Sequence, residues 1–328
     1  MYEQERAVAL DAVKEAVALC VAVSGACRRE GGLDKDDRSP VTVADFGVQA
    51  LVLDRLARAF PDDGLVAEET AEALRRPETA TVADRVLDAV RVAQPTWTLD
   101  SACEAIDRGQ GGGGSRGRFW TLDPIDGTKG FLRGGQYAVA LALIVEGEVV
   151  LGVLGCPNLQ PEGGGEPGLL FEAVRGGGTR VLPAVGSGAA RAVHVSGRQD
   201  PASLVLCESV ESGHTAQGWS AAVSRRLGSG RPPVRVDSQC KYAVVARGEA
   251  DVYLRLPTRP DYEERIWDHA AGWLVATESG GRVTDIAGRD LDFARGRTLA
   301  ANRGVVVTNG LLHDAVLAAV DAEAPHAV

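Results

Sequence analysis

Two aspartates flank a proline in the segment LDPIDGT at residues 122–128. The proline fixes one backbone torsion and Gly127 permits another, so the carboxylates of Asp123 and Asp126 and the main-chain carbonyl of Ile125 could converge on one small volume. Ligands that are all oxygen favour Mg²⁺ over zinc or copper. An ordinary surface turn has the same composition. A metal site is therefore favoured over a simple turn only if carboxylates from other parts of the chain could join this one.

Further acidic residues lie where predicted strands end or predicted helices begin. Glu68 and Glu69 follow a predicted strand at 65–67, which would let one carboxylate point into a cleft. Asp45 and Asp268 each lie near a predicted helix start, where a carboxylate is either a cap or a member of the same acidic group. Carboxylates that meet would repel and raise one another's pKa unless divalent cations neutralised them. Taken together, the acidic residues favour a shared metal site.

Apolar periodicity predicts the elements of the first half of the chain. A long helix is expected over residues 2–29, and a second one begins with the stretch 41–45 and continues through 56. These helices would pack against a largely antiparallel sheet. Its expected strands are 65–67, one ending at Leu122, 137–145, 149–154 and 169–174.

The second half alternates strands with helices, which is the α/β pattern. The segment PAVGSGAA at residues 183–190 predicts a boundary between an N-terminal α+β domain, 1–185, and a C-terminal α/β domain, 186–328. Beyond this boundary we expect strands near 193–195, 204–207, 252–256 and 305–307, and helices near 215–227, 239–247, 269–279 and 312–322.

Composition limits the class of protein. The chain has 328 residues, of which 45% are hydrophobic and 24% charged, enough for one large or two moderate globular domains. Its apolar stretches are shorter than a membrane span and its start lacks signal-peptide character, so we expect a cytoplasmic protein, or an organellar one if a targeting segment precedes Met1. The six cysteines form no CxxC pair, which indicates reduced thiols. A net charge of −10 argues against nucleic acid and anionic membranes as partners.

Several motifs occur in an order that is typical of one family. The first set is SPVTVAD at 39–45, AEE at 67–69, LDPIDGTKGF at 122–131 and IWDHAAG at 266–272. With these motifs the chain resembles the lithium-sensitive, magnesium-dependent phosphomonoesterases of the inositol monophosphatase superfamily. Its likeness within that group is to the 3'(2'),5'-bisphosphate nucleotidases and spans nearly the whole chain. It is carried by QYAVALAL at 136–143, LGCPNL at 154–159, DSQCKY at 237–242 and DVYLRLP at 251–257.

The resemblance implies a layered α/β/α/β/α sandwich of the inositol monophosphatase and fructose-1,6-bisphosphatase type, with the active site between two domains. It also implies two or three Mg²⁺ ions and a catalytic pair, Asp45 and Thr128, that activates water. Carried over by position, the metal ligands would be Glu68, Asp123, the Ile125 carbonyl, Asp126 and Asp268.

The resemblance further implies a substrate, adenosine 3',5'-bisphosphate, which loses its 3'-phosphate to give AMP, and 3'-phosphoadenylyl sulfate as a second substrate. We expect a monomer or weak homodimer. A predicted helix start flanked by Ser238 and Lys241 could seat an anion. From the residues alone, Arg255 would be a surface ion pair with Asp251 or a neighbour, and His214 a solvated loop residue. The implied substrate-binding residues are Gly127, Thr128, His214, Ser238, Lys241, Arg255 and Asp268.

Two other activities remain open from the sequence. One is an inositol mono- or bisphosphate phosphatase, and the other is a catalytically inactive sensor of adenosine phosphates. Ala67 stands where the superfamily usually has glycine, and Gly135 replaces a common acidic residue, although neither change removes a ligand. Lys129 and Arg133 either have structural roles or screen the acidic site.

Overall fold

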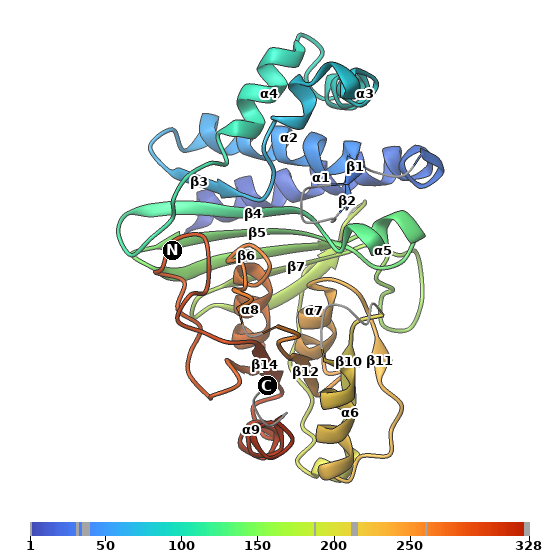
Figure 1. Cartoon of the computed structure of the whole chain (residues 1–328), viewed down its shortest axis with the longest axis vertical. Coiled ribbons are helices and arrows are strands. Elements are labelled where there is room, and N and C mark those ends of the chain that lie inside the picture. The colour runs from blue at the N-terminus through green and yellow to red at the C-terminus, as the bar shows by residue number, and fades with distance from the viewer. Residues whose placement is uncertain are drawn as a thin grey trace.

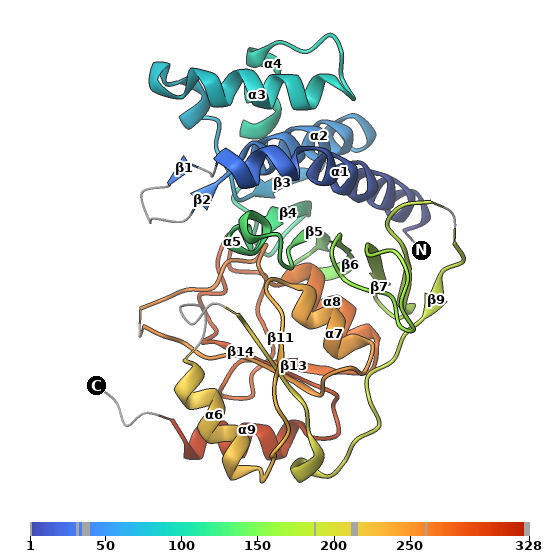
Figure 2. The ribbon, with the colours of Figure 1, turned by 90° about the vertical axis from the view of Figure 1, so that its right-hand side faces the viewer.

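The computed structural model describes residues 2–30, 33–34, 40–186, 188–210, 216–259 and 261–324. Two sheets alternate with layers of helices along the long axis of the molecule (Figures 1 and 2). This is the α/β/α/β/α layering that the resemblance implied.

The larger sheet has seven strands in sequence order, β3-β4-β5-β6-β7-β8-β9. Only the β3–β4 pair is parallel, and the other neighbours are antiparallel. The strands are β3 (Gly64–Ala67), β4 (Arg118–Asp126), β5 (Ala138–Val145), β6 (Glu148–Cys156), β7 (Leu169–Val174), β8 (Gly178–Pro183) and β9 (Arg191–Ala192).

Helices cover one face of this sheet in two tiers. α1 (Glu3–Glu30) and α2 (Val43–Ala59) pack on the sheet, while α3 (Ala80–Arg91) and α4 (Leu99–Asp107) lie beyond α2 (Figure 1). Apolar side chains from these helices and from the sheet form one core. The short two-stranded sheet of β1 (Leu33–Asp34) and β2 (Pro40–Val41) leads into α2, and α5 (Thr128–Arg133) follows β4.

The smaller sheet has five strands in the order β11-β10-β12-β14-β13. α7 (Cys240–Ala246) and α8 (Ala270–Glu278) lie between the two sheets, and α6 (Gln217–Arg226) and α9 (His313–Ala322) cover its outer face (Figure 2). The strands are β10 (Leu206–Glu208), β11 (Val234–Arg235), β12 (Val252–Arg255), β13 (Arg282–Thr284) and β14 (Val305–Thr308).

Strand β5 explains how α8 comes so close to the larger sheet. Side chains alternate across a strand, so its leucines and valines enter the core under α1 and α2, and its alanines face α8. Glycines also permit close contacts of α8 with β6 and with α7. A Cβ atom on Gly152 would lie 2.9 Å from the carbonyl oxygen of Ala271, and one on Gly272 would lie 2.3 Å from the ring of Tyr242. The residues that precede α8, Asp268 among them, are therefore held near the end of β4.

Some expectations from the sequence are wrong in detail. The strand expected at 193–195 lies at Arg191–Ala192 instead. β4 does not end at Leu122 but continues to Asp126, with a shift of register between Asp123 and Asp126. The division into domains at 185/186 stays a prediction. Among the described residues, none of the helices combines the length and the apolar composition that crossing a bilayer requires.

Candidate functional site

A pocket of about 790 Å³ lies where the ends of β3 and β4 meet the segment between β12 and α8. Residues from both halves of the chain line it. Its acidic part includes four of the side chains that the sequence groups together, namely Glu68, Asp123, Asp126 and Asp268, whereas Asp45 and Glu69 do not line it. Its basic part contains Lys129, Arg255, Arg259, Arg265 and Arg297.

The irregular end of β4 turns two carboxylates toward the pocket. Asp123 is only 2% exposed, and among the described residues its Oδ1 atom has no hydrogen-bond partner. Asp126 accepts a hydrogen bond on Oδ2 from the main-chain N–H of Gln239, at 2.5 Å. Gly127 then adopts a φ of 87° and begins α5, and a Cβ atom there would lie 2.9 Å from the Cβ of Ser238. Glycine permits both the backbone conformation and this close approach.

Asp45 is a helix cap and also a neighbour of Thr128. The sequence left open whether Asp45 is a cap or part of the acidic site, and its position in the structure is compatible with both roles. Its Oδ2 atom accepts hydrogen bonds from the main-chain N–H of Thr42, at 2.7 Å, and from the Thr42 hydroxyl, at 2.6 Å. Its Oδ1 atom lies 3.4 Å from Oγ1 of Thr128. The Thr128 hydroxyl also lies 3.1 Å from the carbonyl oxygen of Ile125. One buried carboxylate therefore anchors α2 and faces the start of α5.

The backbone on each side of Glu68 is held by hydrogen bonds to a side chain from another part of the chain. On one side, the side-chain amide of Gln49 donates to the carbonyl of Glu69 at 2.7 Å and accepts from its N–H at 2.9 Å. On the other side, Arg297 donates to the carbonyl of Ala67 at 2.6 Å. The roles of Gln49 and Arg297 cannot be predicted from the sequence, because neither residue belongs to a chemical motif.

The acidic residues shift one another's proton affinity. Burial and the nearby carboxylates of Glu68, Asp126 and Asp268 raise the pKa of Asp123 well above its usual range. Burial, partly offset by the charge of Arg255, raises the pKa of Asp268 to about 8. Burial also raises the pKa of Asp126. An added cation would relieve this repulsion, so the donor set fits a hard divalent ion.

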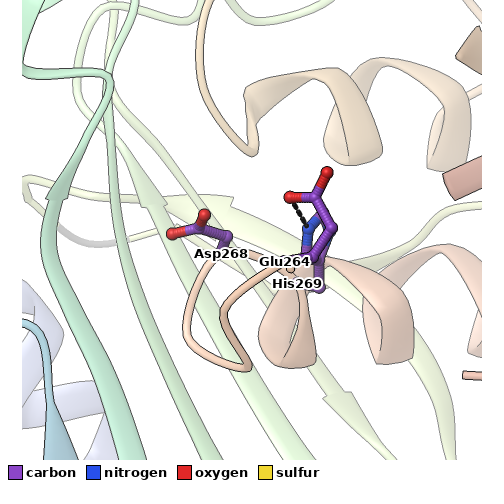
Figure 3. A group of neighbouring side chains, drawn as sticks. All are labelled: Glu264, Asp268 and His269. Atoms are coloured by element: carbon purple, nitrogen blue, oxygen red, sulfur yellow. Dashed lines mark hydrogen bonds and ion pairs between the residues drawn. The ribbon is translucent and has the colours of Figure 1, made fainter. Parts of the chain in front are cut away.

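Glu264, Asp268 and His269 offer ligand atoms that all lie within 4.8 Å of one another (Figure 3). In Figure 3, Asp268 points away from the other two, which bond to each other. Nε2 of His269 lies 3.1 Å from Oε2 of Glu264, and Nδ1 lies 2.7 Å from the hydroxyl of Tyr242. Burial lowers the pKa of His269 and so favours its neutral form. With both ring nitrogens engaged, Glu264 and His269 form a hydrogen-bonded support, and the three residues together are not a metal site. Asp268 lines the pocket instead.

Arg255 connects that support to the pocket. Its Nε atom lies 2.7 Å from Oε2 of Glu264, and its Nη2 atom lies 3.5 Å from Oδ2 of Asp268. The arginine holds the pKa of Glu264 at about 2 despite burial. Arg255 is thus not the surface ion pair that the residues alone suggested, because Asp251 is buried and pairs with Arg198.

The other predicted substrate-binding residues have different positions. Gly127 and Thr128 line the pocket. Ser238 packs against Gly127, and Lys241 is 3% exposed with its Nζ atom 5.0 Å from the ring centre of Tyr253, so both lie behind the pocket lining. Burial lowers the pKa of Lys241. His214 lies outside the described residues.

The structure gives different positions to Lys129 and Arg133, the two basic residues of α5 whose roles the sequence leaves open. Lys129 lines the pocket, while Arg133 forms an ion pair with Asp237. Asp237 in turn accepts a hydrogen bond from the main-chain N–H of Val210 at 3.1 Å. Gln239, which sequence analysis quoted only as part of a motif, joins the carbonyl of Trp267 and the N–H of Gly272 through its side-chain amide. The segment 237–239 therefore ties the β4 turn to the start of α8.

Comparisons with known proteins agree over nearly the full length. The model of the inositol monophosphatase family matches residues 1–324. A 3'(2'),5'-bisphosphate nucleotidase of Emericella nidulans is 45% identical, with 97% of this chain and 98% of that protein covered. The enzyme of that name in Schizosaccharomyces pombe is 42% identical, with coverage of 99% and 98%. The solved structure of a Thermotoga maritima IMPase matches with a TM-score of 0.65 at 22% identity, covering 96% of this chain and 95% of that one, which shows a shared fold.

Proposed function

Because the chain belongs to the inositol monophosphatase family, we propose that it is a Mg²⁺-dependent phosphatase that converts adenosine 3',5'-bisphosphate to AMP and phosphate. Support comes from relatives named 3'(2'),5'-bisphosphate nucleotidase that are 42 to 45% identical over almost the whole chain. We propose 3'-phosphoadenylyl sulfate as a second substrate, because it carries the same 3'-phosphate.

One observation supports this proposal more than any other. A single pocket joins Glu68, Asp123, Asp126 and Asp268 to a set of basic side chains. The buried Oδ1 atom of Asp123 has no hydrogen-bond partner among the described residues. A buried carboxylate oxygen without a partner is costly, and a cation bound in the pocket would supply the missing interaction.

The residues present fit Mg²⁺. Glu68, Asp123, Asp126, Asp268 and the Ile125 carbonyl would hold two or three ions with oxygen donors alone. When bound, the ions would lower the pKa of an attacking water and stabilise charge that develops on the leaving oxygen. A site shared by more than one ion needs donors that are spread along the pocket wall. This agrees with the separate origins of these carboxylates, which come directly after β3, from β4 and from the segment before α8.

Thr128 and Asp45 would move the proton of the attacking water. The Thr42 bonds occupy Oδ2 of Asp45, which leaves Oδ1 facing the Thr128 hydroxyl. The proton would pass from water to Oγ1 of Thr128 as the hydroxyl proton of Thr128 passes to Oδ1 of Asp45. Thr42 fixes the carboxylate and α5 fixes the threonine side chain, so the transfer needs only a rotation of the hydroxyl proton from the Ile125 carbonyl toward Oδ1 of Asp45.

The basic part of the pocket would bind the second phosphate of the substrate. Arg255 is held in place by Glu264 and lies at the boundary with the acidic part. Ser238, Lys241 and His214 stay predictions for the 5'-phosphate and adenosine, together with Gly127 on the pocket wall. An acidic chain can accept a doubly phosphorylated nucleotide in this way, because bound metals would take one phosphate and local cations the other.

The proposal is tested by phosphate release with and without Mg²⁺ from adenosine 3',5'-bisphosphate, inositol 1,4-bisphosphate, inositol monophosphate and fructose 1,6-bisphosphate. We expect the adenosine bisphosphate to have the highest kcat/KM and to require Mg²⁺. Asp123→Asn should lower its turnover by about three orders of magnitude or more. Faster release from an inositol phosphate would favour the alternative phosphatase, and nucleotide binding without any release would favour the inactive sensor.

A further inference from the structure

Arg297 makes a set of contacts that no motif accounts for. Its Nη1 atom donates to the carbonyls of Gly109 and Gly111, at 3.1 and 2.9 Å, and its Nη2 atom donates to that of Ala67, at 2.6 Å. Its guanidinium also lies over the ring of Trp267, 4.8 Å from the ring centre. Within the described part of the chain, no carboxylate lies within ion-pair distance of Arg297, although the residue lines an acidic pocket.

The main-chain acceptors belong to two segments that meet beside Glu68. The loop 109–111 runs along the outer edge of β3, where the N–H of Ala67 donates to the carbonyl of Gly109 at 2.8 Å and the N–H of Gly111 donates to that of Leu65 at 2.9 Å. Arg297 donates hydrogen bonds to the loop 109–111 and to β3 at Ala67, the last residue of that strand. The next residue of the strand segment is Glu68, so the guanidinium fixes the backbone from which that carboxylate projects.

Arg297 also contacts the residue beside a second carboxylate. Trp267, whose ring the guanidinium of Arg297 lies over, directly precedes Asp268 in the sequence. A planar guanidinium can donate in its own plane and stack on its face at the same time, which a lysine ammonium cannot do. Arg297 therefore connects the backbone beside Glu68 to the side chain beside Asp268, two acidic residues that come from different halves of the chain.

We propose that Arg297 is a positioning residue that sets the separation of Glu68 and Asp268 for binding Mg²⁺. This inference rests on the proposed function, because it assigns metal ligation to those two carboxylates. Groups that orient metal ligands typically change metal affinity by about 10- to 100-fold when they are removed. A role in substrate binding would instead change the KM for the nucleotide, and a purely structural role would change stability alone.

The test compares Arg297→Met and Arg297→Lys with the wild type and with a control, Arg295→Met. Arg295 lies on the same segment and pairs with Asp292 at 2.7 Å, and its side chain is 62% exposed. Mg²⁺ binding is measured by titration calorimetry without nucleotide, folding by Tm without metal, and kcat and KM at saturating Mg²⁺.

We expect Arg297→Met to bind Mg²⁺ about 10- to 100-fold more weakly, with a KM for the nucleotide within about twofold of wild type once Mg²⁺ is saturating. Arg297→Lys should keep the charge but lose the planar fork, and should bind Mg²⁺ several-fold more weakly. Arg295→Met should match the wild type in both measurements.

Several results would overturn the inference. They are wild-type Mg²⁺ affinity in a folded Arg297→Met protein, a raised KM with unchanged Mg²⁺ affinity, or equal losses in Arg295→Met. If Arg297→Met does not fold, wild-type affinity in folded Arg297→Lys overturns it. A wild-type protein that binds no Mg²⁺ would overturn the proposed function as well, whereas unchanged affinity in the variants overturns only the role of Arg297.

Discussion

Asp45 shows how a single side chain can serve the fold and the chemistry with different oxygen atoms. Oδ2 completes the cap of α2 with Thr42, and Oδ1 faces Thr128. Because the cap holds the carboxylate still, its position relative to Thr128 depends on the N-terminus of α2. Substituting Asp45 would therefore disturb stability and catalysis together, so Thr128 is the better residue for separating them.

We predict that Thr128→Val lowers kcat by about 10²- to 10⁴-fold, the usual contribution of a positioned proton-transfer group. Valine has nearly the shape of threonine but no hydroxyl to relay a proton to Asp45. Thr128→Ser keeps the hydroxyl and should recover most of the activity. Phosphate release and Tm are measured for both variants. Equal kcat values for the valine and serine variants would contradict the proton relay.

Glu264 is the second residue with a separable role, since it touches Arg255 and His269 but does not itself line the pocket. We predict that Glu264→Gln raises the KM for adenosine 3',5'-bisphosphate by about tenfold, because a neutral amide holds a guanidinium less firmly than a carboxylate does. The KM for adenosine 3'-monophosphate, which lacks the 5'-phosphate, should change less. An equal rise for both nucleotides would argue against Arg255 as the partner of the 5'-phosphate.

At the scale of elements, periodicity predicts most of the helices and strands, and motif order predicts where the carboxylates gather. The described chain also contains α3, whose buried Ala83, Val86 and Val90 follow a helical period that sequence analysis overlooked. The contact of Arg297 with Ala67 could not have been predicted, because it joins residues 230 positions apart through main-chain carbonyls. Such contacts depend on tertiary packing, which leaves no local pattern.

The approach of α8 to β6 yields a prediction about an element. A methyl group at Gly152 would meet the Ala271 carbonyl oxygen at 2.9 Å, so Gly152→Ala should push α8 away from the larger sheet and lower stability by about 1–3 kcal/mol. Mg²⁺ affinity should fall as well, since Asp268 moves with the helix. Gly197→Ala is the control, because a Cβ there meets no atom within 4 Å. Unfolding in denaturant and Mg²⁺ titration measure both effects.

At the scale of the whole molecule, the acidic pocket makes stability depend on pH and metal. Asp268 has a pKa of about 8 in the folded chain against an ordinary value of 3.8, so the folded state binds more protons than the unfolded state between these values. The free energy of unfolding of the metal-free protein should therefore fall as the pH rises through that window.

The measurement is the Tm at pH 5.5 and at pH 8, each with and without Mg²⁺. We expect Mg²⁺ to raise the Tm more at pH 8, where Asp268 has lost part of its proton, than at pH 5.5, where it is protonated and competes with the ion. Asp268→Asn should reduce this difference, because the substituted side chain no longer titrates. A Mg²⁺ effect that is the same at both pH values would contradict a carboxylate site.

The helical layer of α7 and α8 has a consequence for how the enzyme must release its products. Apolar side chains of both sheets and of these two helices belong to one continuous core. The two sheets therefore cannot move apart without exposing that core to water. Substrate and products must therefore enter and leave through an opening of the pocket that forms without separating the two sheets. An inhibitor that fills this opening would block both entry of the substrate and release of the products.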